Sequence, residues 1–151
     1  MAPSTHNRLT LPDCLACDLM SADVTTIDRR TSFEEALALF IERNVTAAPV
    51  TGEQGVPVGV LSVTDLLIHI RASDSSQVVP ATVETMMTPT IFTVPAKMPA
   101  ADVVRDMLRS HVHHLFVEDS AGKITGVIST CDVLRHLQTC EEIATNSPRS
   151  L

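Results

Sequence analysis

The stretch that decides the fold is Gly59-Val60-Leu61-Ser62-Val63-Thr64-Asp65, and it returns 67 residues later as Gly126-Val127-Ile128-Ser129-Thr130-Cys131-Asp132. In both copies a glycine and apolar residues close a predicted strand, and hydroxyl side chains with an aspartate open a predicted helix. The same shift lays residues 14–70 over residues 81–137 without a gap. Identical residues then coincide at Met20/Met87, Thr26/Thr93, Val45/Val112, Val50/Val117, Gly55/Gly122, Gly59/Gly126, Val60/Val127, Ser62/Ser129, Asp65/Asp132, Leu67/Leu134 and His69/His136. A repeat this regular indicates one structural unit present twice.

Each copy predicts the order strand, helix, strand, strand, helix. The first helix starts at Ser32-Phe33-Glu34-Glu35, which has the form of a capping box, and its counterpart starts at Pro99, which suits a first helical turn. Later strands are predicted at 47–50 and 57–61, with counterparts at 114–117 and 124–128, and last helices at 65–70 and 132–137. Because about 60 residues bury little surface alone, we expect an α/β (α+β) fold of two pseudo-symmetric β-α-β-β-α repeats packed sheet to sheet.

The predicted organisation has five parts. They are an N-terminal tail (1–12), a first repeat (13–70), a polar linker (71–82), a second repeat (83–138) and a C-terminal tail (139–151).

Composition and charge exclude several classes of protein. Of 151 residues, 44% are apolar and 19% charged, which is typical of a globular chain. No apolar run approaches the ~20 residues that cross a bilayer, and no secretion signal is recognisable. We therefore expect a cytoplasmic protein with no membrane partner. A net charge of −7 and the absence of Tyr and Trp disfavour nucleic-acid binding, and four Cys fit a reducing compartment.

The two helix starts are the sharpest chemical signal. Free N–H groups and hydroxyls at a helix N-terminus suit a phosphate, and a carboxylate there suits the paired hydroxyls of a ribose. Ser, Thr and Asp are also ordinary helix caps that need no ligand. Recurrence of the same glycine and aspartate at a fixed offset favours the binding interpretation.

Both copies resemble a CBS domain, the family named after cystathionine β-synthase. The resemblance rests in the first copy on Asp18-Leu19-Met20-Ser21, the Ser32 helix, Val45–Val50 and Gly59–Leu67, and in the second on Thr85-Met86-Met87-Thr88-Pro89, the Pro99 helix, Val112–Val117 and Gly126–Leu134. It spans roughly residues 14–137, as a CBS pair or Bateman module. It implies a regulatory, non-catalytic module that binds adenine nucleotides between its repeats and commonly dimerises.

The resemblance also implies two clefts. The first would use Ser62, Thr64 and Asp65, faced by Thr88, Ile91, Val112, His113 and His114. The second would use Ser129 and Asp132, faced by Ser21, Val24, Thr26, Val45, Thr46 and Ala47. Cys131 replaces the second hydroxyl there, and Phe116 stands where Pro49 keeps the family's proline. Since a thiol is a weak donor, we expect the first cleft to bind more tightly.

Two further clusters leave alternatives open. His111, His113 and His114 fit a phosphate contact, a metal site, or a strand with one His in solvent and one in the core. Cys14-Leu15-Ala16-Cys17 lacks the further ligands that zinc needs, and a small buried hydrophobe fits there as well.

The predicted function is an adenine-nucleotide sensor without catalytic activity. No catalytic motif is present, and no cofactor is expected apart from a regulatory AMP, ADP or ATP. We expect a homodimer that acts on an effector protein not encoded in this sequence. The alternatives are a ligand-free adaptor or dimerisation pair, a module for S-adenosylmethionine, and a metal or redox protein using Cys14, Cys17 and the histidines.

Overall fold

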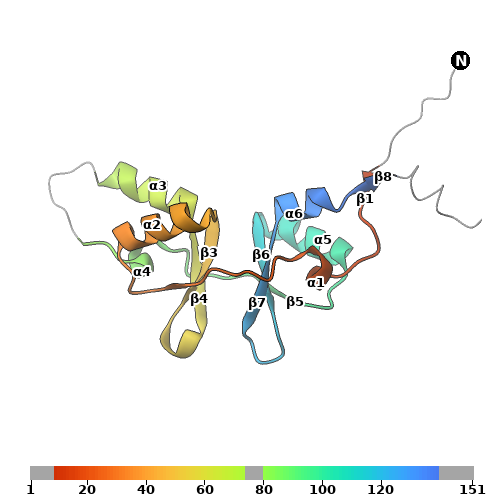
Figure 1. The fold of residues 1–151 in the computed structure, drawn as a ribbon, viewed down its shortest axis with the longest axis horizontal. Coiled ribbons are helices and arrows are strands. Elements are labelled where there is room, and N and C mark those ends of the chain that lie inside the picture. Colours follow the sequence, from red (N-terminus) through yellow and green to blue (C-terminus); the bar gives the residue numbers. More distant parts are fainter. Residues whose placement is uncertain (1–8, 74–79, 140–151) are drawn as a thin grey trace, which may run out of the picture.

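The computed structural model describes residues 9–73 and 80–139, in which one arrangement of elements occurs twice (Figure 1). The first unit contains β2 (Ile27–Asp28), α2 (Phe33–Arg43), β3 (Ala47–Thr51), the 3-10 helix η1 (Glu53–Gly55), β4 (Pro57–Ser62) and α3 (Val63–Ala72). The second contains β5 (Thr93–Pro95), α5 (Ala100–Ser110), β6 (His114–Glu118), β7 (Ile124–Ser129) and α6 (Thr130–Arg135). The predicted α/β class and the β-α-β-β-α order of each repeat are confirmed.

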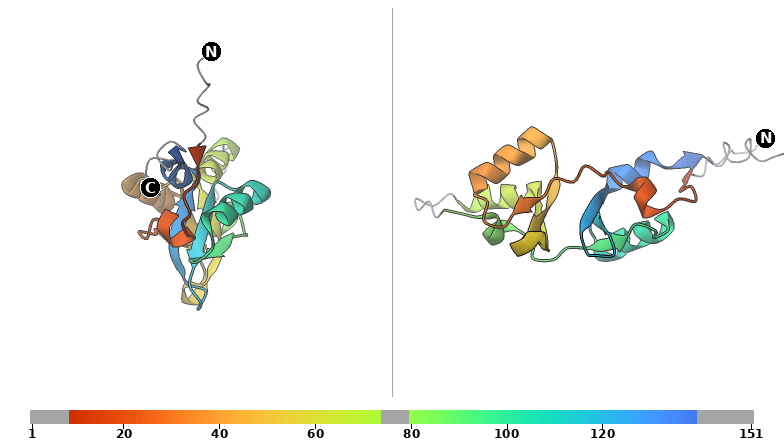
Figure 2. Two further views of the ribbon diagram at one scale, coloured as in Figure 1. Left: turned by 90° about the vertical axis from the view of Figure 1, so that its right-hand side faces the viewer. Right: turned by 60° about the horizontal axis from the view of Figure 1, so that its bottom comes forward.

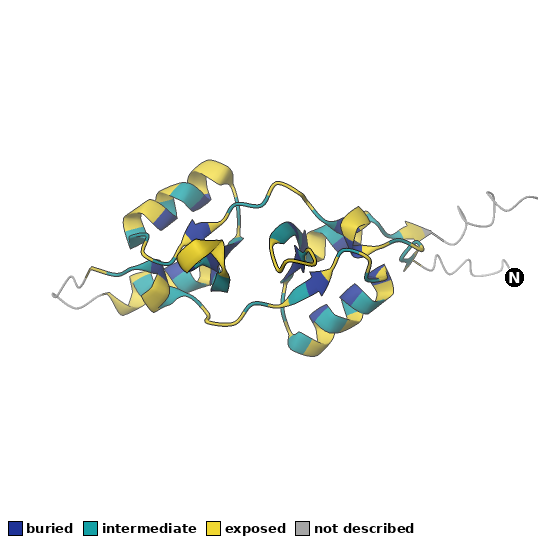
Figure 3. Ribbon diagram, turned by 90° about the horizontal axis from the view of Figure 1, so that it is seen from below, coloured by how far each residue is buried: buried dark blue, intermediate teal, exposed yellow. Residues whose placement is uncertain are grey.

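Each unit is built on a three-stranded mixed sheet. β2 is parallel to β3, and β3 is antiparallel to β4; β5, β6 and β7 repeat this pattern. The two sheets face each other at the centre of the molecule, and the helices lie on their outer sides (Figure 1). Each unit has its own core, one centred on Phe40 and Leu61, the other on Leu115 and Ile128. Figure 3 shows the buried residues on the inner faces of the helices.

Capping boxes fix where the helices begin. Ser32 accepts a hydrogen bond from the Glu35 amide at 3.2 Å, as its spacing predicted. α3 and α6 begin two residues earlier than expected, because Ser62 and Ser129 are themselves the N-caps. Pro99 is the residue before α5 and not part of its first turn.

Two short helices exchange places between the units. α1 (Ala16–Leu19) packs against the second unit, where the Ala16 amide donates to the Met98 carbonyl at 2.8 Å. α4 (Val83–Met86) packs against the first unit, where the Val83 amide donates to the Thr31 carbonyl at 2.8 Å. Figure 2 shows α1 in red beside the second unit and α4 in green beside the first. The chain therefore crosses between the units twice, before β2 and after α4. A simple succession of two repeats would cross only once.

Part of the predicted tails is ordered into a small sheet. β1 (Leu9–Thr10) pairs antiparallel with β8 (Gln138–Thr139). Residues 1–8 and 140–151 of the tails, and residues 74–79 of the predicted linker, lie outside the described residues. Among the residues that are described, no helix is long and apolar enough to cross a membrane.

Gly59 and Gly126 lie where the crossing connections pass over the sheets. A Cβ at Gly59 would overlap the Thr88 carbonyl oxygen, which accepts a 2.9 Å hydrogen bond from the Val60 amide. A Cβ at Gly126 would overlap the thioether of Met20, a flexible side chain. The same substitution therefore meets backbone in one repeat and a movable side chain in the other.

We expect Gly59→Ala to lower the free energy of unfolding by about 3 kcal/mol and Gly126→Ala by about 1 kcal/mol, the two ends of the usual range for overpacking. Denaturant unfolding of the two variants beside the unsubstituted protein measures both values. An equal or larger loss at Gly126 would show that Met20 is as rigid as the Thr88 backbone.

Candidate functional site

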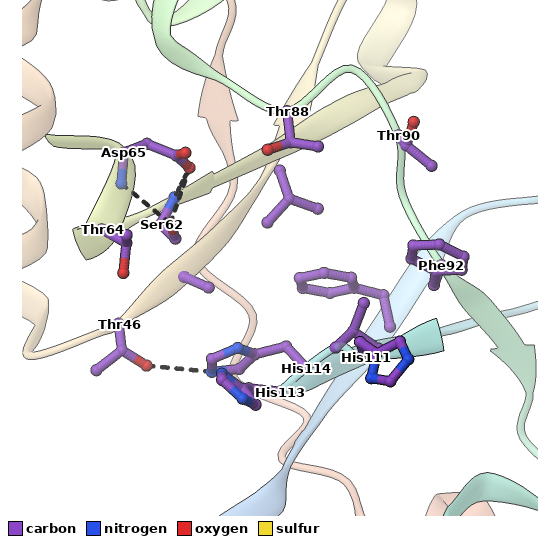
Figure 4. A pocket seen from close by; sticks show the side chains of 14 residues that line it. Thr46, Ser62, Thr64, Asp65, Thr88, Thr90, Phe92, His111, His113 and His114 are labelled. Atoms are coloured by element: carbon purple, nitrogen blue, oxygen red, sulfur yellow. Dashed lines mark hydrogen bonds between the residues drawn. The ribbon is translucent and has the colours of Figure 1, made fainter. Parts of the chain in front are cut away.

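A cavity of about 330 Å³ lies between the two units (Figure 4). Four segments line it: the start of β3, the junction of β4 with α3, the connection from α4 to β5, and the turn from α5 into β6. Its lining residues are Thr46, Ala47, Val60, Ser62, Thr64, Asp65, Thr88, Thr90, Phe92, His111, Val112, His113, His114 and Phe116. A molecule in this cavity would contact both repeats.

Most residues predicted for the first cleft lie together here. Ser62, Thr64, Asp65, Thr88, Val112, His113 and His114 all line the cavity. Ile91 does not, although its neighbours Thr90 and Phe92 do. Thr46 and Ala47 were assigned to the second cleft, and the structure instead includes them in the lining of this one. The reason is strand register, because Ala47 pairs with Ser62 and so lies beside the first helix start.

At the start of α3, which is one corner of the cavity, Ser62 and Asp65 form a capping box, and two polar groups beside it make no hydrogen bond within the described residues. Asp65 Oδ2 accepts hydrogen bonds from the Ser62 amide at 2.7 Å and the Ser62 hydroxyl at 2.8 Å. The Asp65 amide donates to Ser62 Oγ at 3.2 Å. Neither Asp65 Oδ1 nor the Thr64 hydroxyl bonds to another described residue, so both face the cavity unpaired. Ser62 thus shapes the corner, and Asp65 and Thr64 are the groups a ligand can reach.

The opposite wall carries three histidines. His111 ends α5 in the left-handed conformation (φ 53°), which turns the chain toward β6. His114 Nε2 and Thr46 Oγ1 are 3.1 Å apart and form a hydrogen bond between the two repeats. Burial lowers the pKa of His114, its neighbour His113 lowers it further, and Asp132 raises it in part. His114 therefore loses its proton more readily than an ordinary histidine.

Apolar residues that the sequence interpretation missed complete the cavity. Val60, Phe92 and Phe116 extend the apolar lining beyond Ala47 and Val112, while Thr90 and His111 add polar groups. Phe116 was noted only as a departure from Pro49, and His111 only as part of a cluster. The chain has four Phe, and two of them gather here. This rarity was the one signal in the sequence that pointed to them.

Asp132 has the same local geometry with one added partner. Its Oδ2 accepts from the Ser129 amide at 2.7 Å and the Ser129 hydroxyl at 2.9 Å. Its Oδ1 also accepts from Arg135 at 3.3 Å, and the residue equivalent to Arg135 in the first repeat is Ile68. The carboxylate oxygen that stays free at Asp65 is therefore occupied at Asp132.

The remaining residues predicted for the second cleft come from several parts of the chain. Ser21 pairs through its backbone with Val127 at 2.9 Å. Val24 and Thr26 lie in the connection from α1 to β2, and Val45 packs against the core of the first unit.

The Cys-x-x-Cys motif flanks α1. Cys14 is half-buried against the second core, as a small hydrophobe would be, whereas Cys17 is exposed. Burial raises the pKa of the Cys14 thiol, and Asp18 and Asp13 raise it further, so the thiol is not activated. Within residues 9–73 and 80–139, no three His, Cys, Asp or Glu side chains are grouped to hold a metal ion.

Comparison with known proteins gives one consistent family. The model of the CBS domain matches residues 16–72 and again residues 83–139. The solved CBS domain pair of protein MJ0100, in complex with 5′-methylthioadenosine and S-adenosyl-L-methionine, has a TM-score of 0.73 at 23% identity and covers 82% of this chain and 95% of that one. CBSX2 in complex with AMP has a TM-score of 0.68 at 27% identity and covers 86% and 98%.

Curated relatives are longer proteins. The gamma-3 subunit of 5′-AMP-activated protein kinase from Sus scrofa is 29% identical over 108 residues, which are 68% of this chain and 21% of that protein. Across the first eight curated relatives, the matched region spans between 21% and 58% of the relative's length.

Proposed function

The chain belongs to the CBS domain family as a tandem pair, and on that premise we propose that it is a regulatory module that binds an adenine nucleotide between its two repeats. The observation that carries the proposal is the cavity in which Asp65 and Thr64 of one repeat face His113 and His114 of the other. The solved relative CBSX2 in complex with AMP supports the choice of ligand, as does the likeness to a subunit of a kinase named for activation by AMP.

The chemistry of the walls fits the three parts of such a ligand. The apolar residues Val60, Phe92 and Phe116 suit a purine base. Asp65 Oδ1 suits ribose hydroxyls, because a carboxylate accepts paired hydrogen bonds. Thr64 and the histidines suit the 5′ substituent. A volume of about 330 Å³ lies within the range of small-molecule sites.

The proposed regulatory effect follows from the shared walls. A ligand that contacts both repeats stabilises one relative arrangement of them, and an equilibrium shifts only by the difference in affinity between arrangements. The proposal gives the chain no catalytic role, and it assigns the output to an effector protein that recognises the arrangement.

We expect calorimetry with AMP, ADP, ATP and S-adenosylmethionine to detect at least one adenine nucleotide bound at one site per chain. S-adenosylmethionine shares the adenosine part and is the alternative ligand. Binding of S-adenosylmethionine alone would identify the chain as a module for that ligand. No detectable binding of any of the four would identify a ligand-free adaptor. Mass spectrometry of any ligand released from the purified protein is the independent check.

We also propose that the module is a homodimer. Exposed apolar side chains recur at the repeat offset on the outer helices: Ile41 of α2 and Leu108 of α5 are 72% and 71% exposed, and Leu67 of α3 and Leu134 of α6 are 60% and 64% exposed. Apolar groups this exposed favour an interface. Because the pattern is the same in both repeats, a second copy related by a two-fold axis can cover it with the same residues.

A further inference from the structure

We propose that this cavity selects its adenosine ligand by charge, taking a nucleoside or a monophosphate in preference to a triphosphate, with His114 as the residue that makes phosphate binding depend on protonation. The inference rests on the proposed function, since it concerns the same cavity. It adds the ligand class and the residue that determines it.

The charges that line the cavity provide the first reason. Its ionisable residues are Asp65, His111, His113 and His114, and no Lys or Arg is among the described lining residues. Asp65 contributes a negative charge next to the α3 corner, and the whole chain carries −7. Phosphate is held most strongly by charge-assisted hydrogen bonds. Each further phosphate therefore adds repulsion from Asp65 without a permanent cation in the lining to offset it.

The start of α3 provides the second reason, because its donors are largely used within the protein. The Val63 amide donates to the Thr46 carbonyl at 3.0 Å. The Asp65 amide donates to the Ser62 hydroxyl, which itself donates to Asp65 Oδ2. A helix N-terminus binds anions through free N–H groups, and here only the Thr64 amide and hydroxyl remain. The helix start therefore offers only two donors to a phosphorylated ligand.

His114 decides whether a charged partner is present at all. The groups around it are His113 just before β6, His111 at the end of α5, Asp65 across the cavity and Asp132 on α6. Burial and His113 lower its pKa more than Asp132 raises it, so the imidazole that bonds to Thr46 loses its proton more readily than an ordinary histidine. A bound phosphate stabilises the protonated form. Affinity for a phosphorylated ligand is thus highest at low pH and falls as pH rises, whereas affinity for uncharged adenosine stays constant.

Calorimetry with adenosine, AMP and ATP at about pH 6 and about pH 8 tests this within the titration range of histidine and above the protein's pI of 5.2. We expect AMP to lose about tenfold of its affinity relative to adenosine between these values, the loss of roughly one charge-assisted hydrogen bond. At about pH 8 we expect ATP to bind at least about tenfold more weakly than AMP.

Two variants distinguish the pH dependence that comes from the protein from the pH dependence that comes from the ligand. His114→Gln keeps an amide that can bond to Thr46 but cannot be protonated, so the pH dependence of the ratio between AMP and adenosine should shrink to the part that comes from the ligand. The phosphate of AMP itself titrates near pH 6, and that contribution would persist in this variant. His69→Gln, on α3 beside Phe33 and outside the cavity lining, is the matched control and should behave as the unsubstituted protein.

The outcomes distinguish the inference from the proposed function. If adenosine and AMP bind with a ratio that does not change with pH, or ATP binds as tightly as AMP at about pH 8, charge selection is wrong and the nucleotide module stands. If His114→Gln retains the full pH dependence, His114 is not the determinant and the inference is overturned. If none of the three ligands binds, the proposed function fails and the inference fails with it.

Discussion

Replacing Asp65 by alanine is expected to lower the affinity for AMP about a hundredfold, while Asp132→Ala leaves it within about threefold. Asp65 Oδ1 is unpaired and faces the cavity, so it is the acceptor available to both ribose hydroxyls. Two hydrogen bonds to a charged group, at about 1.5 kcal/mol or more each, correspond to a factor of at least about a hundred. Calorimetric titration of both variants measures the difference.

Asp132→Ala is a matched control because it removes the same contacts to an N-cap serine, and beyond these only the exposed Arg135 contact at 3.3 Å. Each aspartate accepts two hydrogen bonds from its own N-cap serine, with distances that agree within 0.1 Å. Unfolding experiments should therefore find similar destabilisation, about 1 kcal/mol for a lost cap. A larger loss of affinity with Asp132→Ala would reverse the order of the clefts, and equal losses would mean that both bind.

The same substitution distinguishes ribose recognition from phosphate recognition. Asp65→Ala removes a contact that adenosine, AMP and ATP share, so their affinities should fall by similar factors. His114→Gln should affect only the phosphorylated ligands. A selective loss of ATP binding with Asp65→Ala would contradict the assignment of Asp65 to the ribose.

The repeated unit was predictable because its signals are local. Ser32, Ser62 and Ser129 each precede an acidic residue by three positions, and all three are N-caps in the structure. The identical spacing of the two copies then implied one architecture for both. The antiparallel pairing of β3 with β4 and of β6 with β7 is also local, since short connections between successive strands favour antiparallel neighbours.

The exchange of α1 and α4 was not predictable from these signals. Each helix has four residues, too few for a helical period to appear in the sequence. Their positions depend on long-range contacts, such as Ala16 with Met98 and Val83 with Thr31. Only the packing of complete units determines those contacts.

The cavity was predictable in part for a similar reason. The helix-start residues Thr64 and Asp65 are specified by the motif, but the residues that face them depend on how the two sheets meet. Thr46 illustrates the limit: by repeat symmetry it is the counterpart of His113, yet it lines the same cavity and bonds to His114. Near the pseudo-symmetry axis a residue and its repeat counterpart, here Thr46 and His113, can line the same cavity, and a repeat alignment does not reveal this.

If the chain is a homodimer, substitutions on its outer helices should halve the mass of the particle in solution. Ile41→Glu combined with Leu108→Glu should convert a dimer into a single chain of 16.3 kDa. The two positions are equivalent in the repeats, and each side chain is more than 70% exposed in one chain. Burying such a side chain contributes about 1.5–3 kcal/mol, and a dimer contains four of them. Their loss should raise the dimer Kd by at least about a thousandfold.

Light scattering at micromolar concentration measures the mass of the unsubstituted protein and its variants. Val56→Glu is the control, because Val56 is 56% exposed but lies at the tip of the β3–β4 hairpin, away from the outer helices (Figure 1). We expect it to remain a dimer. A monomeric unsubstituted protein would contradict the dimer itself, and a double variant that stays dimeric would locate the interface elsewhere. Neither result would alter the cavity, whose walls come from one chain, so nucleotide affinity should be the same in the monomeric variant.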